Sequence, residues 1–277
     1  MDDNASDGIP AEAVVDGFAC WRCGLNVAAG NAACPHCGAT LRSTESAATM
    51  SVTSAPTSEY LLNLLFCTYL LLLVTGILHA FVLRSVIDAR DIANHTFRST
   101  AFTHLSIAEG IDTAIIAIAL WKARHLKSRI QPSQQTRILA WIIALPVLAM
   151  LLALNLGYHA LLRSLLHAPL LTDDLMTKFD LIAVITICVQ PAFVEEAYCR
   201  WFALDCLRGP LGTHAAVWIT GLMFAFLHVA MLTNIPYLIV FGACLAYLRL
   251  MSGTLWLPIM LHFSHNLIIL LIGCIGL

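Results

Sequence analysis

The chain has 277 residues, of which 59% are apolar and only 12% are charged, and its mean hydropathy is +0.81. This composition excludes an ordinary soluble domain and indicates a polytopic membrane protein. The formal net charge of -2 argues neither for nor against nucleic-acid binding. No basic run of the kind that binds phosphate backbones occurs. No nucleic-acid partner is therefore predicted.

The chain begins with three polar segments before its first apolar run. Residues 1–17 are acidic, lack the basic and apolar regions of a secretory signal peptide, and are expected to be disordered. Residues 18–41 are rich in cysteine and form a predicted head. Residues 42–58 are a Ser/Thr/Ala linker, which we expect to be flexible with an end-to-end distance of about 20 to 25 Å.

The head holds two Cys-x2-Cys pairs, "CWRCG" and "CPHCG", separated by ten residues. Four thiolates on two tight turns suit a tetrahedral zinc ion, and the glycine after each pair lets the backbone turn beneath the metal. The pattern resembles a short zinc ribbon with one structural zinc. Two disulfides or unrelated cysteines in a disordered tail are the alternatives, and a cytoplasmic location argues against disulfides. The predicted zinc ligands are Cys20, Cys23, Cys34 and Cys37.

The role of this ribbon is left open by its sequence. A docking module for a protein partner, a substrate adaptor and an element that stabilises the fold all agree with it.

From residue 59 onward the chain consists of apolar runs near the 20 residues that a helix needs to cross a bilayer. The sequence predicts an all-α fold: a polytopic transmembrane helix bundle over residues 59–277, in the plasma (inner) membrane, with about seven spans. Six or eight spans are the alternatives. The expected spans are 60–83, 104–123, 138–162, 180–204, 214–232, 235–250 and 255–276.

Lys and Arg residues in the loops predict the orientation, because cytoplasmic loops carry an excess of them. The loop between the second and third spans is the most basic, so we place it and the N-terminus in the cytoplasm. Ten basic residues are then inside and five outside. The inner ones are Arg22, Arg42, Lys122, Arg124, Lys127, Arg129, Arg137, Arg200, Arg208 and Arg249, and the outer ones are Arg84, Arg90, Arg98, Arg163 and Lys178.

Three charged residues lie within the fourth apolar run, in the stretch "FVEEAYCRWF" (residues 193–202). A charge at the centre of a span costs about 2.5 to 3.5 kcal/mol, so such residues are functional candidates. On a helix, Glu196 and Arg200 share one face in the order that favours an ion pair, whereas Glu195 points about 100° away. One carboxylate is thus neutralised locally, and the other remains for chemistry.

Two later runs carry polar residues at the same four-residue spacing. "FAFLH" places Phe224 and His228 on one helix face, and "HFSHN" does so for His262 and Asn266. One carboxylate, two imidazoles and one carboxamide suit acyl transfer to water. They supply a general base, a histidine that orients the water, and two donors for the oxyanion.

The motifs EExxxR, FxxxH and HxxxN, in this order on apolar helices, resemble the CPBP (Abi) family of integral membrane endopeptidases, which includes the type II CAAX prenyl proteases. The resemblance covers about residues 180–276. It implies the following roles: Glu195 as catalytic glutamate, Glu196 and Arg200 as its supporting pair, with Phe224 also supporting, His228 as water-binding histidine, and His262 with Asn266 as oxyanion donors.

The predicted function is therefore an intramembrane endopeptidase that opens to the cytoplasmic side and cleaves a membrane-associated protein or peptide. Glu195 would activate a water molecule, and no cofactor is firmly predicted at this site. A metalloprotease mechanism, with zinc on one carboxylate and two histidines, is the alternative mechanism. A non-catalytic membrane adaptor or immunity-type protein on the same fold is the alternative function. Proton-driven transport is disfavoured, because the broken Gly/Pro helices of a transporter site are missing.

Other ionisable residues in the apolar runs are interpreted more simply. His79, His159 and His214 are expected to be hydrogen-bonded packing residues. His265 is the borderline case, because it is adjacent to Asn266. Glu109 and Asp112 are expected either to line the cavity or to hold a neighbouring helix.

Overall fold

The computed structural model describes residues 17–20, 22–28, 31–41, 58–86, 97–126, 128, 130–166 and 179–275. Within it the chain divides into two compact units, Met1–Val52 and Thr53–Leu277. Apart from Gly17 and Ser58, the predicted disordered N-terminus and the predicted flexible linker lie outside the described residues.

The N-terminal unit is built on two short strands and two similar turns. Strand β1 (Gly17–Ala19) pairs antiparallel with β2 (Asn26–Ala28). Gly24 and Gly38 have left-handed backbones, with φ of 76° and 69°, which glycine adopts without steric cost. The N–H of Gly24 donates to the Cys20 carbonyl at 2.8 Å, and that of Gly38 donates to the Cys34 carbonyl at 2.9 Å. The same glycine-closed turn therefore occurs once in each cysteine pair.

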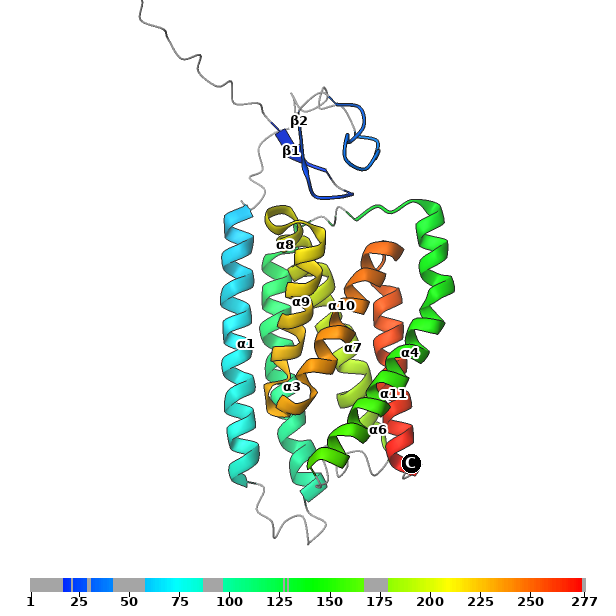
Figure 1. The fold of residues 1–277 in the computed structure, drawn as a ribbon. Coiled ribbons are helices and arrows are strands. Elements are labelled where there is room, and N and C mark those ends of the chain that lie inside the picture. Colours follow the sequence, from blue (N-terminus) through cyan, green and yellow to red (C-terminus); the bar gives the residue numbers. More distant parts are fainter. Residues whose placement is uncertain are drawn as a thin grey trace, which may run out of the picture. The chain divides into compact units, whose positions relative to one another are not determined.

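Helices are the only regular secondary structure in the described part of the C-terminal unit, which confirms the predicted all-α class (Figure 1). Segments η1 and η2 are π-helical, and η3 is a 3-10 helix. The elements are α1 (Ser58–Val86), α3 (Phe97–Lys122), α4 (Gln134–Leu166), α6 (Leu181–Ala183), η1 (Val184–Val189), α7 (Gln190–Glu196), η2 (Ala197–Ala203), α8 (Leu204–Leu211), α9 (Thr213–Leu227), η3 (Val229–Asn234), α10 (Ile235–Ser252) and α11 (Trp256–Ile275).

Six helical segments in the described part of the chain are long and apolar enough to cross a membrane. The helix observed in place of the predicted span over 214–232 is shorter than predicted. This helix, α9, has only 15 residues and a length of about 22 Å. Its end at Leu227 leaves η3 and α10 as one apolar segment of 24 residues. The predicted count of about seven spans thus corresponds to six long segments and one short helix.

The helices alternate in direction along the bundle (Figure 1). We call the end where α1 and α4 begin, and α3 and α10 finish, the proximal end. The distal end is where α3 begins and where α4 and α11 finish. The run from α6 to α8 travels from the distal to the proximal end, and α9 returns.

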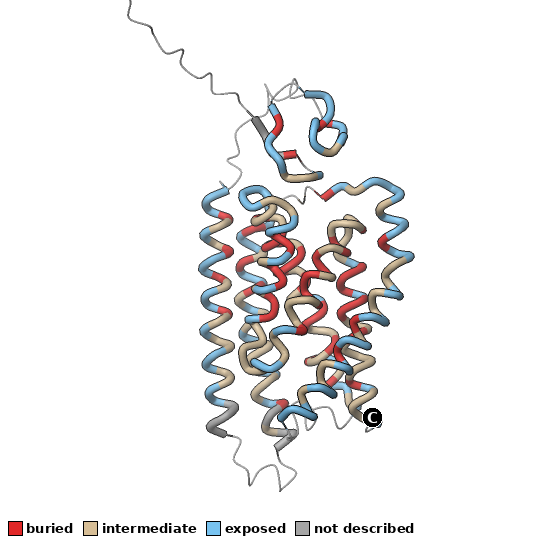
Figure 2. Tube along the Cα trace, in the orientation of Figure 1, coloured by how far each residue is buried: buried red, intermediate tan, exposed pale blue. Residues whose placement is uncertain are grey.

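Many large apolar side chains are exposed on the outer helices. The buried stretches cluster on the central helices (Figure 2). Phe66 in α1 and Leu145 in α4 are 67% and 73% exposed, as expected for surfaces that face lipid. Inside, α9 and α10 approach closely at two glycines. A Cβ on Gly221 would lie 3.0 Å from the Ile239 carbonyl oxygen, so a larger residue here would require the backbone to shift by a few tenths of an ångström.

Candidate active site

Helix α7 carries both glutamates and lies between the π-helical segments η1 and η2. π-Helical segments are rare in proteins, and those that occur often lie at functional sites. Pro191 has no N–H, so the Ile187 carbonyl oxygen lacks its usual α-helical donor. The Asn266 carboxamide Nδ2 donates to this oxygen at 2.9 Å and so ties α11 to η1.

Glu196 is fully buried and has two partners. Its Oε2 lies 3.1 Å from Arg200 Nε, and its Oε1 accepts a 2.9 Å hydrogen bond from His262 Nδ1. The Arg200 partner follows from the four-residue spacing in the sequence. The His262 partner does not, because it comes from another helix. Glu196 therefore joins η2 to α11 through one carboxylate.

The Phe224 ring contacts Arg200 and two histidines of the site. The Arg200 guanidinium carbon lies 4.6 Å from the ring centroid, a cation–π contact. The rings of His228 and His262 lie 5.0 Å and 5.7 Å from the same centroid. Arg200 is held further by a 3.2 Å hydrogen bond from Nη2 to the Gly242 carbonyl.

Glu195 faces His228 across a short gap. Its Oε1 lies 3.8 Å from His228 Nε2, beyond direct hydrogen-bonding distance. On the other side of the imidazole, Nδ1 donates to the Phe224 carbonyl at 3.0 Å, because a carbonyl can only accept. In the neutral ring, Nε2 is then an acceptor. Two acceptors thus face each other at a spacing that one water molecule can bridge.

His265 belongs to the site, although sequence spacing alone left its place undecided. Its Nε2 lies 2.7 Å from the Tyr237 hydroxyl, and its Nδ1 lies 3.1 Å from Asn266 Oδ1. Since Nδ1 faces a carbonyl-type oxygen, it carries the proton and Nε2 accepts from Tyr237. Sequence analysis missed Tyr237, whose only signal is a hydroxyl in an apolar run.

A cavity of about 240 Å³ connects these groups. Glu196 and Arg200 do not line it and lie behind its wall. Glu109 lines it, whereas Asp112 accepts a 2.8 Å hydrogen bond from Thr75 between α1 and α3. His159, expected to be a packing residue, lines the cavity as well. The polar and aromatic lining includes Glu109, Asn155, His159, Arg163, Glu195, Phe224, His228, Asn234, Tyr237, His262, His265 and Asn266.

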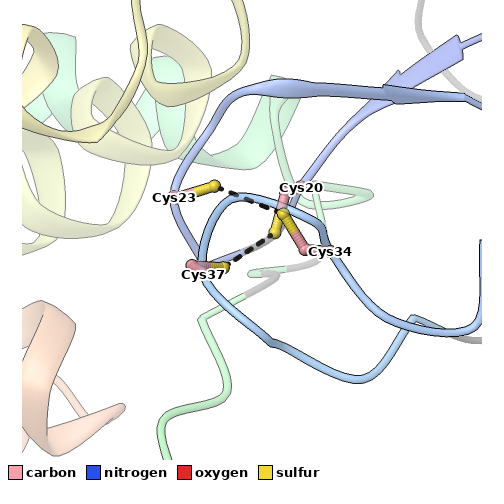
Figure 3. A group of neighbouring side chains, drawn as sticks. All are labelled: Cys20, Cys23, Cys34 and Cys37. Carbon is pink, nitrogen blue, oxygen red and sulfur yellow. Dashed lines mark hydrogen bonds between the residues drawn. The ribbon is translucent and has the colours of Figure 1, made fainter.

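The four cysteines of the N-terminal unit form a second cluster (Figure 3). Their Sγ atoms all lie within 4.8 Å of one another, and the pairs Cys20–Cys37 and Cys23–Cys34 are 3.7 Å apart. A tetrahedron with Zn–S bonds of about 2.3 Å has S–S edges of about 3.8 Å. The cluster therefore has the dimensions of a zinc site with four cysteine ligands.

The thiols of this cluster differ in acidity. Burial raises the pKa of Cys34, but backbone N–H groups of His36 and Cys37 and neighbouring thiols outweigh it and lower the pKa to about 6. Chiefly because of burial, the pKa of Cys23 rises to about 12. A divalent metal has to displace the proton of such a thiol, so its binding depends on pH.

In the described residues, only these cysteines place three or more His, Cys, Asp or Glu ligand atoms so close together. Glu195, His228 and His262 line one cavity but do not form such a group.

The helices and the cavity define a polytopic integral membrane protein with a polar site inside its helix bundle. A family model described as Type II CAAX prenyl endopeptidase Rce1-like matches residues 177–268, which hold all three motifs. This match, over about a third of the chain, supports the CPBP family that the three motifs resemble. The family is one of proteases, which supports a membrane endopeptidase of the CAAX type. No curated protein and no solved structure matches the chain.

Proposed function

We propose that the protein is an intramembrane endopeptidase in which Glu195 activates a water molecule. The observation that carries this proposal is the 3.8 Å gap between Glu195 Oε1 and His228 Nε2 inside the cavity. Both atoms accept hydrogen bonds, so a bridging water donates one O–H to each. Its oxygen lone pairs then remain free to attack a carbonyl carbon.

The reaction needs one proton to move twice. Glu195 takes a proton from the water as the water oxygen bonds to the scissile carbonyl carbon, and a tetrahedral oxyanion forms. When the C–N bond breaks, the same proton passes from Glu195 to the leaving amine. The products are a carboxylic acid and an amine, and Glu195 is again a carboxylate.

Asn266 and His262 are the proposed donors to the oxyanion, with different requirements. The Asn266 carboxamide has two N–H bonds, and the one given to Ile187 leaves the second for the oxyanion. The Nδ1–H of His262 donates a hydrogen bond to Glu196. Its Nε2 can therefore donate to the oxyanion only when the ring is an imidazolium, with Glu196 as the counter-ion. Removing one donor from a known oxyanion hole costs about 3 to 4 kcal/mol of transition-state stabilisation.

The metal-free mechanism is supported by the geometry of the possible ligands. Glu195, His228 and His262 are not within the ligand-atom spacing that the four cysteines show in the described residues. A metal held by one carboxylate and two imidazoles therefore requires these side chains to move.

The test compares peptides in membranes from cells that express the wild type or Glu195→Gln at equal abundance. Glutamine keeps the size of the side chain but cannot take the proton, so we expect cleavage to fall about 100-fold or more. Glu59→Gln, an exposed change at the start of α1, is the matched control and should cleave normally. New peptide termini are measured by mass spectrometry.

Each other outcome has a defined meaning. Equal cleavage by Glu195→Gln would show that the glutamate mechanism is wrong. If zinc restores chelator-sensitive cleavage in a variant without the cysteine head, the metalloprotease mechanism replaces it. If even the wild type yields no specific products, the non-catalytic adaptor function becomes the better hypothesis.

For the N-terminal unit we propose a zinc ribbon that holds one structural Zn²⁺ through four thiolates. The support is the tetrahedral size of the sulfur cluster and the glycine-closed turn in each pair. Bound zinc would fix the two turns against each other, because the described part of the unit buries few apolar residues. Besides cysteine, these are Val27, Ala39 and Leu41.

A further inference from the structure

A chain of hydrogen bonds runs from α10 to the Asn266 carboxamide on α11. The Tyr237 hydroxyl lies 2.7 Å from His265 Nε2, and His265 Nδ1 lies 3.1 Å from Asn266 Oδ1. Asn266 Nδ2 continues the chain to the Ile187 carbonyl oxygen in η1, at 2.9 Å. All three side chains line the cavity, although Tyr237 and His265 are each only 4% exposed. The proposed mechanism uses Asn266 but gives no task to the other two side chains.

The direction of each hydrogen bond in this chain is fixed from its Ile187 end. A backbone carbonyl only accepts, so the Asn266 amide nitrogen faces it and the amide oxygen faces His265. His265 Nδ1 therefore carries a proton. In the neutral ring, Nε2 then accepts from the Tyr237 hydroxyl over 2.7 Å.

Two observations favour the neutral ring over an imidazolium. An imidazolium would donate from Nε2 to Tyr237 and turn the hydroxyl hydrogen toward the Leu151 carbonyl, which is 3.4 Å away. The neutral ring gives this hydrogen the much shorter bond. Both nitrogens of His265 also face uncharged groups, and a buried positive charge without a carboxylate partner is costly.

This chain holds the carboxamide of Asn266 in one of its two orientations. A 180° flip would set its oxygen against the Ile187 oxygen, and its N–H groups against the Nδ1–H of His265. Two acceptors and two donors would then face each other, which leaves buried polar groups unpaired. The flip would also put an oxygen where an oxyanion needs an N–H donor.

The aromatic rings of α10 restrict the movement of His265. The Tyr237 ring stacks on the imidazole at an interplanar angle of 24°, with centroids 5.9 Å apart. The Phe241 ring, one turn later on α10, lies 4.7 Å from His265 and 5.2 Å from His262. A close-packed ring has little room to change rotamer, so the place of its Nδ1–H is fixed as well.

We propose that Tyr237 and His265 are positioning residues that act on the reaction through Asn266. The inference rests on the proposed peptidase function, in which the second N–H of the Asn266 carboxamide donates to the oxyanion. A donor that already points at the developing charge does not have to reorient during the reaction. Loss of the chain should therefore slow the chemical step and leave substrate binding unchanged.

The tautomer of His265 tests the chain without any substrate. Nitrogen-15 NMR of the full-length protein, labelled at histidine and held in detergent, distinguishes Nδ1–H from Nε2–H. The signals that disappear in His265→Gln identify this residue. We expect the neutral Nδ1–H form in the wild type, and a shifted Nε2 signal in Tyr237→Phe, where Nε2 loses its donor. An Nε2–H tautomer or an imidazolium at His265 would overturn the proposal.

A second tyrosine provides the matched control for this measurement. The Tyr69 hydroxyl donates to the Met223 carbonyl at 3.4 Å, and Tyr69 is not among the residues that line the cavity. Tyr69→Phe should therefore leave the His265 signals and the rate of cleavage unchanged. An equal response of both tyrosine variants would show that the effect is not specific to the chain.

Kinetics measure whether the chain contributes to the chemical step. The substrate is a synthetic peptide that spans a cleavage site found in the comparison of membrane peptides. We expect Asn266→Ala to lower kcat about 100-fold or more. Tyr237→Phe and His265→Leu should lower it about 10-fold at unchanged KM, because the carboxamide still samples the productive orientation. His265→Gln should recover most of this loss, since its amide can both donate and accept.

Combination with Asn266→Ala separates positioning from a structural role. If Tyr237 acts only through the carboxamide, Tyr237→Phe has no further effect on kcat once Asn266 is alanine. A further loss of about 10-fold in the double variant would overturn the proposal, as would a raised KM with unchanged kcat in Tyr237→Phe. Melting temperatures in detergent verify that the proteins compared are folded.

The two measurements also distinguish failure of this inference from failure of the proposed function. If the wild type cleaves peptides but His265 lacks the expected tautomer, the peptidase function stands and the positioning role is wrong. If His265 has the expected tautomer but the wild type cleaves nothing, the peptidase function fails and the positioning role fails with it.

Discussion

Phe224 shows how a single apolar residue organises the site. Its ring contacts the Arg200 guanidinium and the imidazoles of His228 and His262, and its carbonyl oxygen accepts from His228. The ring therefore sets the distance between two histidines that have different tasks in the proposed mechanism. It also covers the positive charge of Arg200 with a π face.

We expect Phe224→Ala to destabilise the membrane unit by about 3 to 5 kcal/mol, because the residue is 1% exposed and its removal leaves a cavity. Cleavage should fall as well, since both histidines lose their common neighbour. Phe226→Ala is the matched control, two residues further along α9 and 43% exposed. Thermal unfolding in detergent measures the difference, and equal melting temperatures for the two variants would contradict this role.

The limits of sequence analysis at this scale follow from which contacts lie within one helix. Spacing of four residues predicted the Glu196–Arg200 pair, because both residues are on the same helical run. It could not predict that His262 shares the Glu196 carboxylate or that Tyr237 contacts His265. These contacts join different helices, and their geometry depends on how the bundle packs.

At the scale of elements, the course of the chain around the site departs from regular helix. The π turns on both sides of α7 and the end of α9 just before His228 have no clear signature in the sequence. Only Pro191 signals a disturbed hydrogen-bond pattern in advance. Hydropathy locates apolar runs but not these local changes, which explains why the predicted span over 214–232 ends in the wrong place.

Close approach of α9 and α10 leads to a prediction about Gly221. A Cβ there would lie 3.0 Å from the Ile239 carbonyl oxygen and 3.1 Å from the Ala243 nitrogen, both backbone atoms that cannot rotate away. Gly221→Ala should therefore push the helices apart and destabilise the bundle by about 1 to 3 kcal/mol. Gly157→Ala, with no atom within 4 Å of the added Cβ, should be tolerated. Unfolding temperatures of the two alanine variants provide the measurement.

The two cysteine turns form a second structural element whose role is testable by metal analysis. If they hold one zinc ion, the purified full-length protein contains about one zinc per chain, and the double variant Cys23→Ser, Cys37→Ser contains almost none. Cys67→Ser removes an exposed cysteine of α1 and should keep the metal. Loss of zinc on acidification is expected too, because protons compete for the thiolates. Full zinc content in the double variant would disprove the ribbon site.

At the scale of the whole molecule, the chain joins two units with separate cores. Among the described residues, the N-terminal core consists of cysteines together with Val27, Ala39 and Leu41, whereas the membrane unit has its own clusters around the site. Composition alone predicted this division, since a polar, cysteine-rich segment and a run of apolar helices cannot share one solvent. The lining of the cavity required the packed structure, because it comes from helices that lie far apart in the sequence.

Removing residues 1–57 should therefore leave the membrane unit folded. No transmembrane helix is lost, and the carboxylate, imidazole and carboxamide contacts of the site all lie within residues 58–277. We expect the truncated and full-length proteins to unfold at nearly the same temperature in detergent. If truncation unfolds the bundle, the head is a stabilising part of the membrane fold. If the fold survives but cleavage in cells is lost, the head acts in substrate delivery.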